Sequence, residues 1–395
     1  MRSLSRLVPV AIAGMLGACG GGDSATGPKA GSVTGIAGDN ATAPTGGTLP
    51  VSFVVLGADG FPLSGAKVAW TVSPTSAAAV TPTAVTTDAT GAAATTVNVG
   101  STQGAFTVSG KVNGVDPVAF HLTAVNPCQY LNSYTFGATA SGTLSRADCK
   151  LNGYFYDFYR LDLPTAQQSS VSIGMQSSKF DAYVELYTLN GDLIGADNNV
   201  DQGVKDARLD IILGAGGTYV IGANSLDQDT VGAYTLNTSL RPTSLTGCRD
   251  VWVTPGATVI DTIRTTDCLN TGFYSDEVFM WIQGGTTIRL SERATAFDPL
   301  LKLYQANFST QMFDSVWANN DSSGTNKNAY FSFAVPTEGF FLLDIGTAVA
   351  GQTGEYTLAF SSNTSAGPTA FQTPAAPQPL HFFPFSRVKG WRRRS

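Results

Sequence analysis

A long internal repeat constrains this sequence more than any other feature. Two cysteines, an aromatic segment with the pattern Phe-Asp-x-x-x-x-Leu-Tyr, and a Gly-x-Tyr-Thr-Leu ending each occur twice. The matched positions are Cys128 with Cys248, Cys149 with Cys268, 180–187 with 297–304, and 232–236 with 354–358. The matched positions lie roughly 120 residues apart. A repeat of this length gives each copy enough chain to bury a core, which favours a domain duplication over a solenoid. We therefore expect two tandem copies of one β domain, at 128–240 and 248–362.

Composition and patterning predict an all-β fold. Only 13% of the 395 residues are charged, against roughly 25% in ordinary soluble domains, and 43 Gly and 19 Pro supply turns. Short alternating or apolar runs recur between these turn residues, as in a β-sandwich. Residues 19–386 carry sixteen Lys and Arg against 29 Asp and Glu, a net charge of −13, because the other seven cations lie outside that range. An acidic body of this kind argues against nucleic acid as a partner.

The N-terminus has the features of an export signal. Arg2 and Arg6 precede an apolar stretch at 7–16 that is too short to span a membrane. The following Leu-Gly-Ala-Cys resembles the lipobox of bacterial lipoproteins, with residues 1–18 as signal peptide and Cys19 as the acylated residue. This resemblance implies a lipid anchor in the bacterial cell envelope, with the outer membrane or cell surface favoured. The Gly- and Ser-rich segment 19–31 reads as a flexible tether.

Residues 32–125 show the strand spacing of a sandwich. In the run 67–72, a period of two places Val68, Trp70 and Val72 on one face, which we expect to be core. The segment resembles bacterial Ig-like domains of the invasin and intimin group. The matching stretches are Asp-Gly-x-Pro-x-x-Gly-x-x-Val-x-Trp at 59–70, Thr-Asp-x-x-Gly-x-Ala at 87–93, and Phe-x-Leu-Thr-Ala at 120–124. This resemblance implies an Ig-like sandwich that acts as a stalk.

The two repeat copies resemble the bacterial pre-peptidase C-terminal domain, a small jelly-roll-like β-sandwich. The resemblance rests on the Phe-Asp-x-x-x-x-Leu-Tyr strand, the Asp- and Asn-rich loop after it, and the terminal Gly-x-Tyr-Thr-Leu. It implies an Ig-like β-sandwich followed by two tandem jelly-roll-like sandwiches. No peptidase domain precedes these copies in the sequence, so a binding or spacing role is favoured over a proteolytic one.

Cysteine usage indicates an oxidising compartment. Four cysteines remain besides Cys19, and the repeat selects the pairs Cys128–Cys149 and Cys248–Cys268 among the three pairings that four cysteines allow. A zinc site is the alternative. Two cysteines per copy without a histidine cannot complete a tetrahedral site, so we favour disulfides.

The sequence contains no recognisable catalytic set. Only two histidines occur, His121 in an expected strand and His381 in the tail, and no nucleophile, zinc-protease or phosphate-binding motif is present. Paired carboxylates are the remaining route to hydrolysis. Glu185 and Glu277 qualify only because they are acidic, so we expect a protein that is not an enzyme.

One loop has the ligand spacing of a calcium site. Asp197, Asn199 and Asp201 place oxygen ligands at alternate positions, as Ca²⁺ prefers. The match to an EF-hand is incomplete, since Arg208 stands where the bidentate Glu would be. The alternative is a polar β-turn whose side chains bond their own backbone, and we favour it. Calcium is accordingly the one cofactor with sequence support.

An aromatic run at 154–159 offers a candidate platform. Tyr154, Tyr156 and Phe158 alternate with Phe155 and Tyr159, so one set faces the core and the other faces away. The outward set would either stack on sugar rings or pack against a neighbouring domain, and we favour packing.

We expect the tail 363–395, rich in Pro and ending in cations, to be disordered. Taken together, the sequence predicts a non-enzymatic cell-surface lipoprotein with a stalk and two binding domains, for adhesion or for binding a glycan, protein or matrix ligand. The alternative is an accessory protein that presents or anchors a secreted hydrolase.

Overall fold

The chain folds into strands. The computed structural model describes residues 28–197, 204–245, 247, 251–270, 272–321, 327–363, 372 and 392–394. Within these residues the only helix is the short 3-10 helix η1 (Pro127–Gln129), which confirms the all-β prediction. No helix in the described part is long and apolar enough to cross a membrane. The chain divides into two compact units, the first formed by residues up to 122 without 42–48 and 99–104, the second by the remainder.

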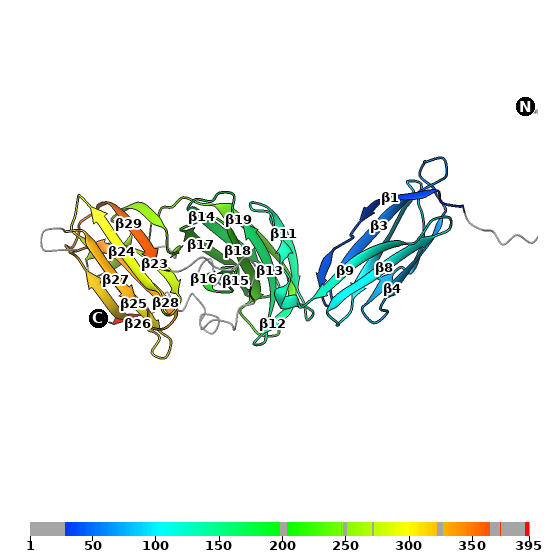
Figure 1. Cartoon of the computed structure of the whole chain (residues 1–395). Coiled ribbons are helices and arrows are strands. Elements are labelled where there is room, and N and C mark those ends of the chain that lie inside the picture. The colour runs from blue at the N-terminus through cyan, green and yellow to red at the C-terminus, as the bar shows by residue number, and fades with distance from the viewer. Residues whose placement is uncertain are drawn as a thin grey trace, which may run out of the picture. The chain divides into compact units, whose positions relative to one another are not determined.

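Nine strands build the N-terminal sandwich (Figure 1). They are β1 (Ser32–Ala37), β2 (Thr42–Pro44), β3 (Thr48–Leu56), β4 (Lys67–Ser73), β5 (Ala78–Thr81), β6 (Ala84–Thr86), β7 (Ala92–Val99), β8 (Gly104–Val112) and β9 (Val118–Val125). They form two sheets with the orders β1-β3-β7-β5 and β2-β9-β8-β4-β6. Alternating sequence gives each strand one apolar face, and two such faces can be buried only against each other.

Aromatic rings fill the centre of this sandwich. The rings of Phe53 and Trp70 lie 5.2 Å apart, and Phe120 lies 6.0 Å from Trp70. Val68 and Trp70 are buried and Val72 is half-buried, so the predicted core face of β4 is confirmed.

The first repeat contains ten strands. They are β10 (Asn132–Ser133), β11 (Thr139–Leu144), β12 (Cys149–Leu151), β13 (Tyr154–Asp162), β14 (Ser169–Gln176), β15 (Ala182–Tyr187), β16 (Leu193–Asp197), β17 (Ala207–Leu213), β18 (Thr218–Ser225) and β19 (Gly232–Leu240). One sheet runs β10-β13-β18-β15-β16, with β12 beside β13, and the other has the order β11-β19-β14-β17.

The second repeat contains the same ten strands in the same order. They are β20 (Val251–Val253), β21 (Thr258–Ile263), β22 (Cys268–Asn270), β23 (Phe273–Ile282), β24 (Thr287–Ala294), β25 (Pro299–Asn307), β26 (Met312–Asn319), β27 (Ala329–Ala334), β28 (Gly339–Thr347) and β29 (Gly354–Ser362). Each strand pairing of the first repeat recurs in the second. For example, β10–β13 corresponds to β20–β23, and β14–β17 corresponds to β24–β27. The sequence repeat is therefore a repeat of topology.

Shared registers define equivalent residues in the two repeats. Leu186 lies opposite Gly195 across β15 and β16, and Leu303 lies opposite Trp317 across β25 and β26. A register shift follows directly after Leu186 and after Leu303. Gly195 and Trp317 consequently occupy the same position of the fold.

Strand β20 joins the two repeats into one sheet. It pairs in parallel with β17 of the first repeat and with β23 of the second, placing Trp252 opposite Ile211 and opposite Phe279. The result is an 11-stranded sheet that runs from β11 through β17 and β20 to β26. Pairing with β20 protects the edge strand β17, whose backbone groups would otherwise need water or another strand.

The hydrophobic cores also meet at this junction. Trp252, Phe279, Trp281 and Phe340 of the second repeat belong to the buried cluster of the first. Ile212 of the first repeat packs into the cluster of the second. Each copy thus has a buried cluster of its own, and aromatic side chains of the second repeat near β20 extend the cluster of the first.

The described cysteines are oxidised. Cys128 and Cys149 form a disulfide with their Cα atoms 4.4 Å apart, which ties η1 to β12. Cys268 is also disulfide-bonded, and its predicted partner Cys248 lies outside the described residues. Within the tail that we expected to be disordered, Arg392–Arg394 form β30, which pairs in parallel with β26.

Candidate functional site

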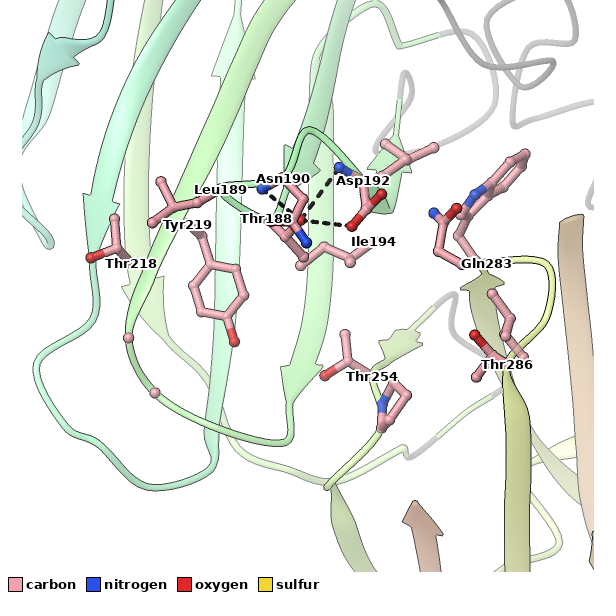
Figure 2. Close-up of a pocket in the computed structure, with 16 residues that line it drawn as sticks. Thr188, Leu189, Asn190, Asp192, Ile194, Thr218, Tyr219, Thr254, Gln283 and Thr286 are labelled. Carbon is pink, nitrogen blue, oxygen red and sulfur yellow. Dashed lines mark hydrogen bonds between the residues drawn. The ribbon is translucent and has the colours of Figure 1, made fainter. Parts of the chain in front are cut away.

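A groove of about 340 Å³ lies where the first repeat meets the second. Figure 2 shows side chains from the β15–β16 turn on one side of it and side chains from the β23–β24 turn on the other. The polar side chains that line it are Thr188, Asn190, Asp192, Thr218, Tyr219, Thr254, Gln283 and Thr286. The groove exists because β20 joins the repeats and brings turns from both to the same place.

The β15–β16 turn is held by its own hydrogen bonds. The Thr188 hydroxyl accepts from the amide of Asn190 at 3.2 Å and from the amide of Asp192 at 3.3 Å. Gly191 completes the turn with a φ of 80°, a backbone conformation that residues with a Cβ rarely adopt. The turn thus presents its polar side chains from a fixed backbone.

The second repeat supplies the opposite wall through closely packed backbone. The amide of Gly214 donates to the Thr254 hydroxyl at 2.9 Å, which links the end of β17 to the end of β20. A Cβ at Gly214 would lie 2.2 Å from the Pro255 carbonyl oxygen and 2.5 Å from the Ala257 amide nitrogen. The walls therefore meet at a point where only glycine fits.

The described lining has hydrogen-bonding groups but no cation. Hydroxyls, amides and the Tyr219 ring line the groove. Asp192 is the one acidic residue in the described lining. Two buried atoms of lining residues, Trp281 Nε1 and Asn190 Oδ1, have no hydrogen-bond partner in the described part of the chain. A buried donor or acceptor left unpaired costs about 1–3 kcal/mol.

Carboxyl groups buried in the sandwiches form a second class of unusual residues. Burial raises the pKa of Asp157 to about 7, although the Tyr234 hydroxyl donates to it at 2.5 Å. The equivalent Asp276 accepts from Tyr356 at 2.8 Å, and burial raises its pKa to about 8. Because the same Tyr–Asp pair recurs in both repeats, it belongs to the architecture of the fold.

Glu185, one of the two candidate acids, is also part of a core. It is fully buried, accepts from the Asn224 amide at 2.8 Å, and burial raises its pKa to about 7. Glu277 lies on β23 of the second repeat and is half-buried. Neither residue lines the junction groove.

The aromatic run of β13 is buried on both faces. Tyr154, Tyr156 and Phe158 are buried, and so are Phe155 and Tyr159. The alternative of an exposed sugar-stacking platform at 154–159 is therefore wrong. β13 lies between β18 and β10 within its sheet, and the rings on both of its faces are covered.

Two of the three residues of the expected calcium site lie outside the residues that the structure describes. Asp197 ends β16, is buried, and its Oδ1 accepts from the Arg208 amide at 3.5 Å. Asn199 and Asp201 lie outside the described residues, as does Cys19. Among the residues that are described, no group of three His, Cys, Asp or Glu is arranged to hold a metal ion.

The groove residues were missed by sequence reasoning. Thr188 and Trp281 are 93 positions apart and belong to different repeats, so no local motif connects them. The one signal in the sequence is the Val-Trp-Val of β20, which stands where the first repeat has the polar Asn132 and Ser133. This difference identifies β20 as a strand buried on two sides.

Comparison with known proteins finds partial likenesses. No protein-family model matches the chain, and no curated protein matches it. Among solved structures, domains 4 and 5 of the S-layer protein SbsC share 17% identity over 25% of this chain and 53% of that one, with a TM-score of 0.21. Invasin, a bacterial integrin-binding protein, shares 15% identity over 85% of this chain and 57% of its own, with a TM-score of 0.20.

The Escherichia coli adhesin FdeC shares 14% identity over 88% of this chain and 96% of that one, with a TM-score of 0.20. The chain spans about half the length of the SbsC fragment that it matches. At such scores the assignment of the fold rests on the strand pairing described above.

Proposed function

We propose that this protein is a non-enzymatic, adhesion-type protein of the bacterial cell surface that binds a neutral, hydroxyl-rich ligand, a glycan, in the junction groove. The observation that carries the proposal is the groove itself. It is formed by both repeats, and most of the polar side chains that line it are neutral hydrogen-bonding groups. Sites of this kind bind through a few polar groups that fix the orientation of the ligand.

The chemistry of the lining supports a glycan over an anionic ligand. Asp192 would repel an anion, and among the described residues no Lys or Arg lines the groove to offset it. Hydroxyl groups can both donate and accept hydrogen bonds, which matches a surface that mixes Thr hydroxyls with the amides of Asn190 and Gln283.

A glycan array probed with the full-length chain in detergent tests this function. We expect Asn190→Ala and Gln283→Ala to weaken binding about tenfold each, since each removes a hydrogen-bonding group from the groove. Gln103→Ala, which alters an exposed amide of the N-terminal sandwich, is the matched control and should bind as the parent does. Absence of any glycan binding, or equal losses in all three variants, would refute the proposal.

The surface location rests on the lipobox resemblance at Cys19. Acyl chains on that residue would anchor the protein, since each buried methylene contributes about 0.8 kcal/mol. Fractionation of cells that express the full chain tests this point, with Cys19→Ser as the variant. We expect the parent protein in the membrane fraction and Cys19→Ser in the soluble exported fraction. An unchanged distribution contradicts lipid anchoring and leaves the groove proposal untouched.

A further inference from the structure

A second, chemically different pocket lies on the first repeat. It has a volume of about 410 Å³ and involves strands β14, β17 and β19 together with the chain that follows β19. Its polar side chains are Ser172, Arg208, Asp210, Ser239, Arg241 and Ser244. None of these residues lines the junction groove.

Two guanidinium groups share one carboxylate in this pocket. Arg208 Nε lies 3.6 Å and Arg241 Nε 3.8 Å from Asp210 Oδ2. Both distances exceed those of N–H···O hydrogen bonds, so Asp210 attracts the two guanidinium groups as a neighbouring charge. The three side chains together carry a net charge of +1, in a chain whose net charge is −6.

The two arginines differ in how they are held. The Arg241 side chain is 11% exposed, and its terminal nitrogens donate to the Ser170 hydroxyl at 3.4 Å and the Ser244 carbonyl at 3.2 Å. The Arg208 side chain is 44% exposed, and its guanidinium makes no hydrogen bond within the described part of the chain. Arg241 is thus a fixed positive charge. Arg208, which is ion-paired with Asp210, lies beside it with its planar set of N–H donors.

The second repeat shows that the fold does not require this cluster. The shared registers place Tyr330 at the position of Arg208 and Ser332 at that of Asp210. Asn363 stands where the first repeat has Arg241, one residue beyond the last strand in each case. The second repeat keeps the same sheet without either arginine, so the cluster does not serve the sheet itself.

We propose that this pocket binds an anionic group, a sulfate or a carboxylate, of an acidic polysaccharide. The planar fork of Arg208 matches two oxygens of such a group, and the fixed charge of Arg241 adds attraction. The hydroxyls of Ser172 and Ser239, at the same pocket, can donate to the remaining oxygens. This site shares no lining residue with the groove, whose described lining has no cation.

Titration calorimetry on the full-length chain in detergent tests the proposal, with a sulfated and a uronate-containing oligosaccharide as separate probes. Binding of the sulfated probe alone identifies sulfate as the group, and binding of the uronate probe identifies carboxylate. We expect Arg208→Gln to weaken binding at least about tenfold, and Arg208→Lys to weaken it less because the charge remains. Affinity should also fall as salt is raised.

Arg289→Gln is the matched control. Arg289 is an exposed arginine on β24, at the position that corresponds to Ser172, and its loss changes the net charge by the same amount. Asn190→Ala, the groove variant, should leave binding of the charged probes unchanged. The proposal is overturned if neither probe binds saturably, if inorganic sulfate binds but no oligosaccharide does, or if Arg289→Gln weakens binding as much as Arg208→Gln.

Discussion

Trp252 of the second repeat packs directly on Gly195 of the first. A Cβ built on Gly195 would lie 3.4 Å from Trp252 Cδ2 and 3.2 Å from the Cδ1 atoms of Ile211 and Leu209. The indole is buried, with Phe340 5.3 Å and Phe279 6.0 Å away between ring centres. This contact is where the two copies of one fold become a single unit.

The far end of the second repeat lacks these small residues. Trp317 stands at the position of Gly195, and Pro336 follows β27 at the place where Gly214 follows β17. A Cβ at Gly214 would meet the backbone of the adjoining chain at 2.2 Å, and proline has no amide to donate. The two small residues that lie against the adjoining chain at β17 and β20 are therefore absent at the corresponding end of the second repeat.

Replacing Trp252 should weaken the whole second unit. Trp252→Ala removes a buried indole from a core that both repeats share, and we expect a loss of about 3–5 kcal/mol in the free energy of unfolding. Trp317→Ala removes an indole that is 43% exposed at the equivalent end of the second repeat, and should cost about 1 kcal/mol. Urea unfolding of the full chain measures both; equal losses would show that the junction carries no special stability.

Gly214→Ala should separate the repeats locally. Its methyl group would clash with backbone atoms that cannot rotate away, so we expect a loss of about 1–3 kcal/mol and weaker glycan binding in the groove. Gly339→Ala is the control, because the atom nearest to its Cβ is Nε2 of the flexible Gln305 side chain, at 2.9 Å. Thermal unfolding and the glycan array report the two effects. A Gly214→Ala protein as stable as Gly339→Ala would contradict the close approach.

Stability should fall as the pH rises from about 5 to about 8. Burial raises the pKa of Asp276 to about 8 and that of Asp157 to about 7, whereas an unfolded Asp titrates near 3.9. Between those values the folded state binds more protons than the unfolded state, so raising the pH favours unfolding. We expect the Tm to drop on the order of 5 °C over this range, measured by circular dichroism.

Asp276→Asn checks the cause of this pH dependence. In the parent, the Tyr356 hydroxyl donates to Asp276 at 2.8 Å. The side-chain amide of the variant keeps an oxygen that can accept this hydrogen bond, but the amide cannot ionise. The variant should show a shallower decline in Tm between about pH 5 and about pH 8. A decline as steep as that of the parent would assign the effect to other groups.

Reduction should destabilise the first repeat. The Cys128–Cys149 disulfide closes a loop with a sequence separation of 21, for which restricting the unfolded chain is worth about 3 kcal/mol. The double variant Cys128→Ser, Cys149→Ser should unfold at lower urea than the parent and become less sensitive to reductant. If the double variant is as stable as the oxidised parent, the disulfide does not contribute to the stability of the first repeat.

The sequence accounts for the local structure because its signals are local. Alternation at Val68 and Trp70 marks the core face of β4, and the paired motifs at 180–187 and 297–304 mark a duplicated sheet. For Phe155 and Tyr159 it left two alternatives open and favoured packing, and the structure buries both on the second face of β13. Alternation assigns residues to two faces of a strand and does not say what covers each face.

The sequence by itself determined the all-β class, the strand pattern of the N-terminal sandwich and the repeat, since these follow from residue spacing along single strands and from comparing the chain with itself. Only the tertiary structure decided that β20 joins both repeats, that Trp252 lies on Gly195, and that a groove and an arginine pocket result. The physical reason is distance along the chain: these sites are assembled by pairing strands whose residues are tens of positions apart, and no periodicity records which edge strand meets which.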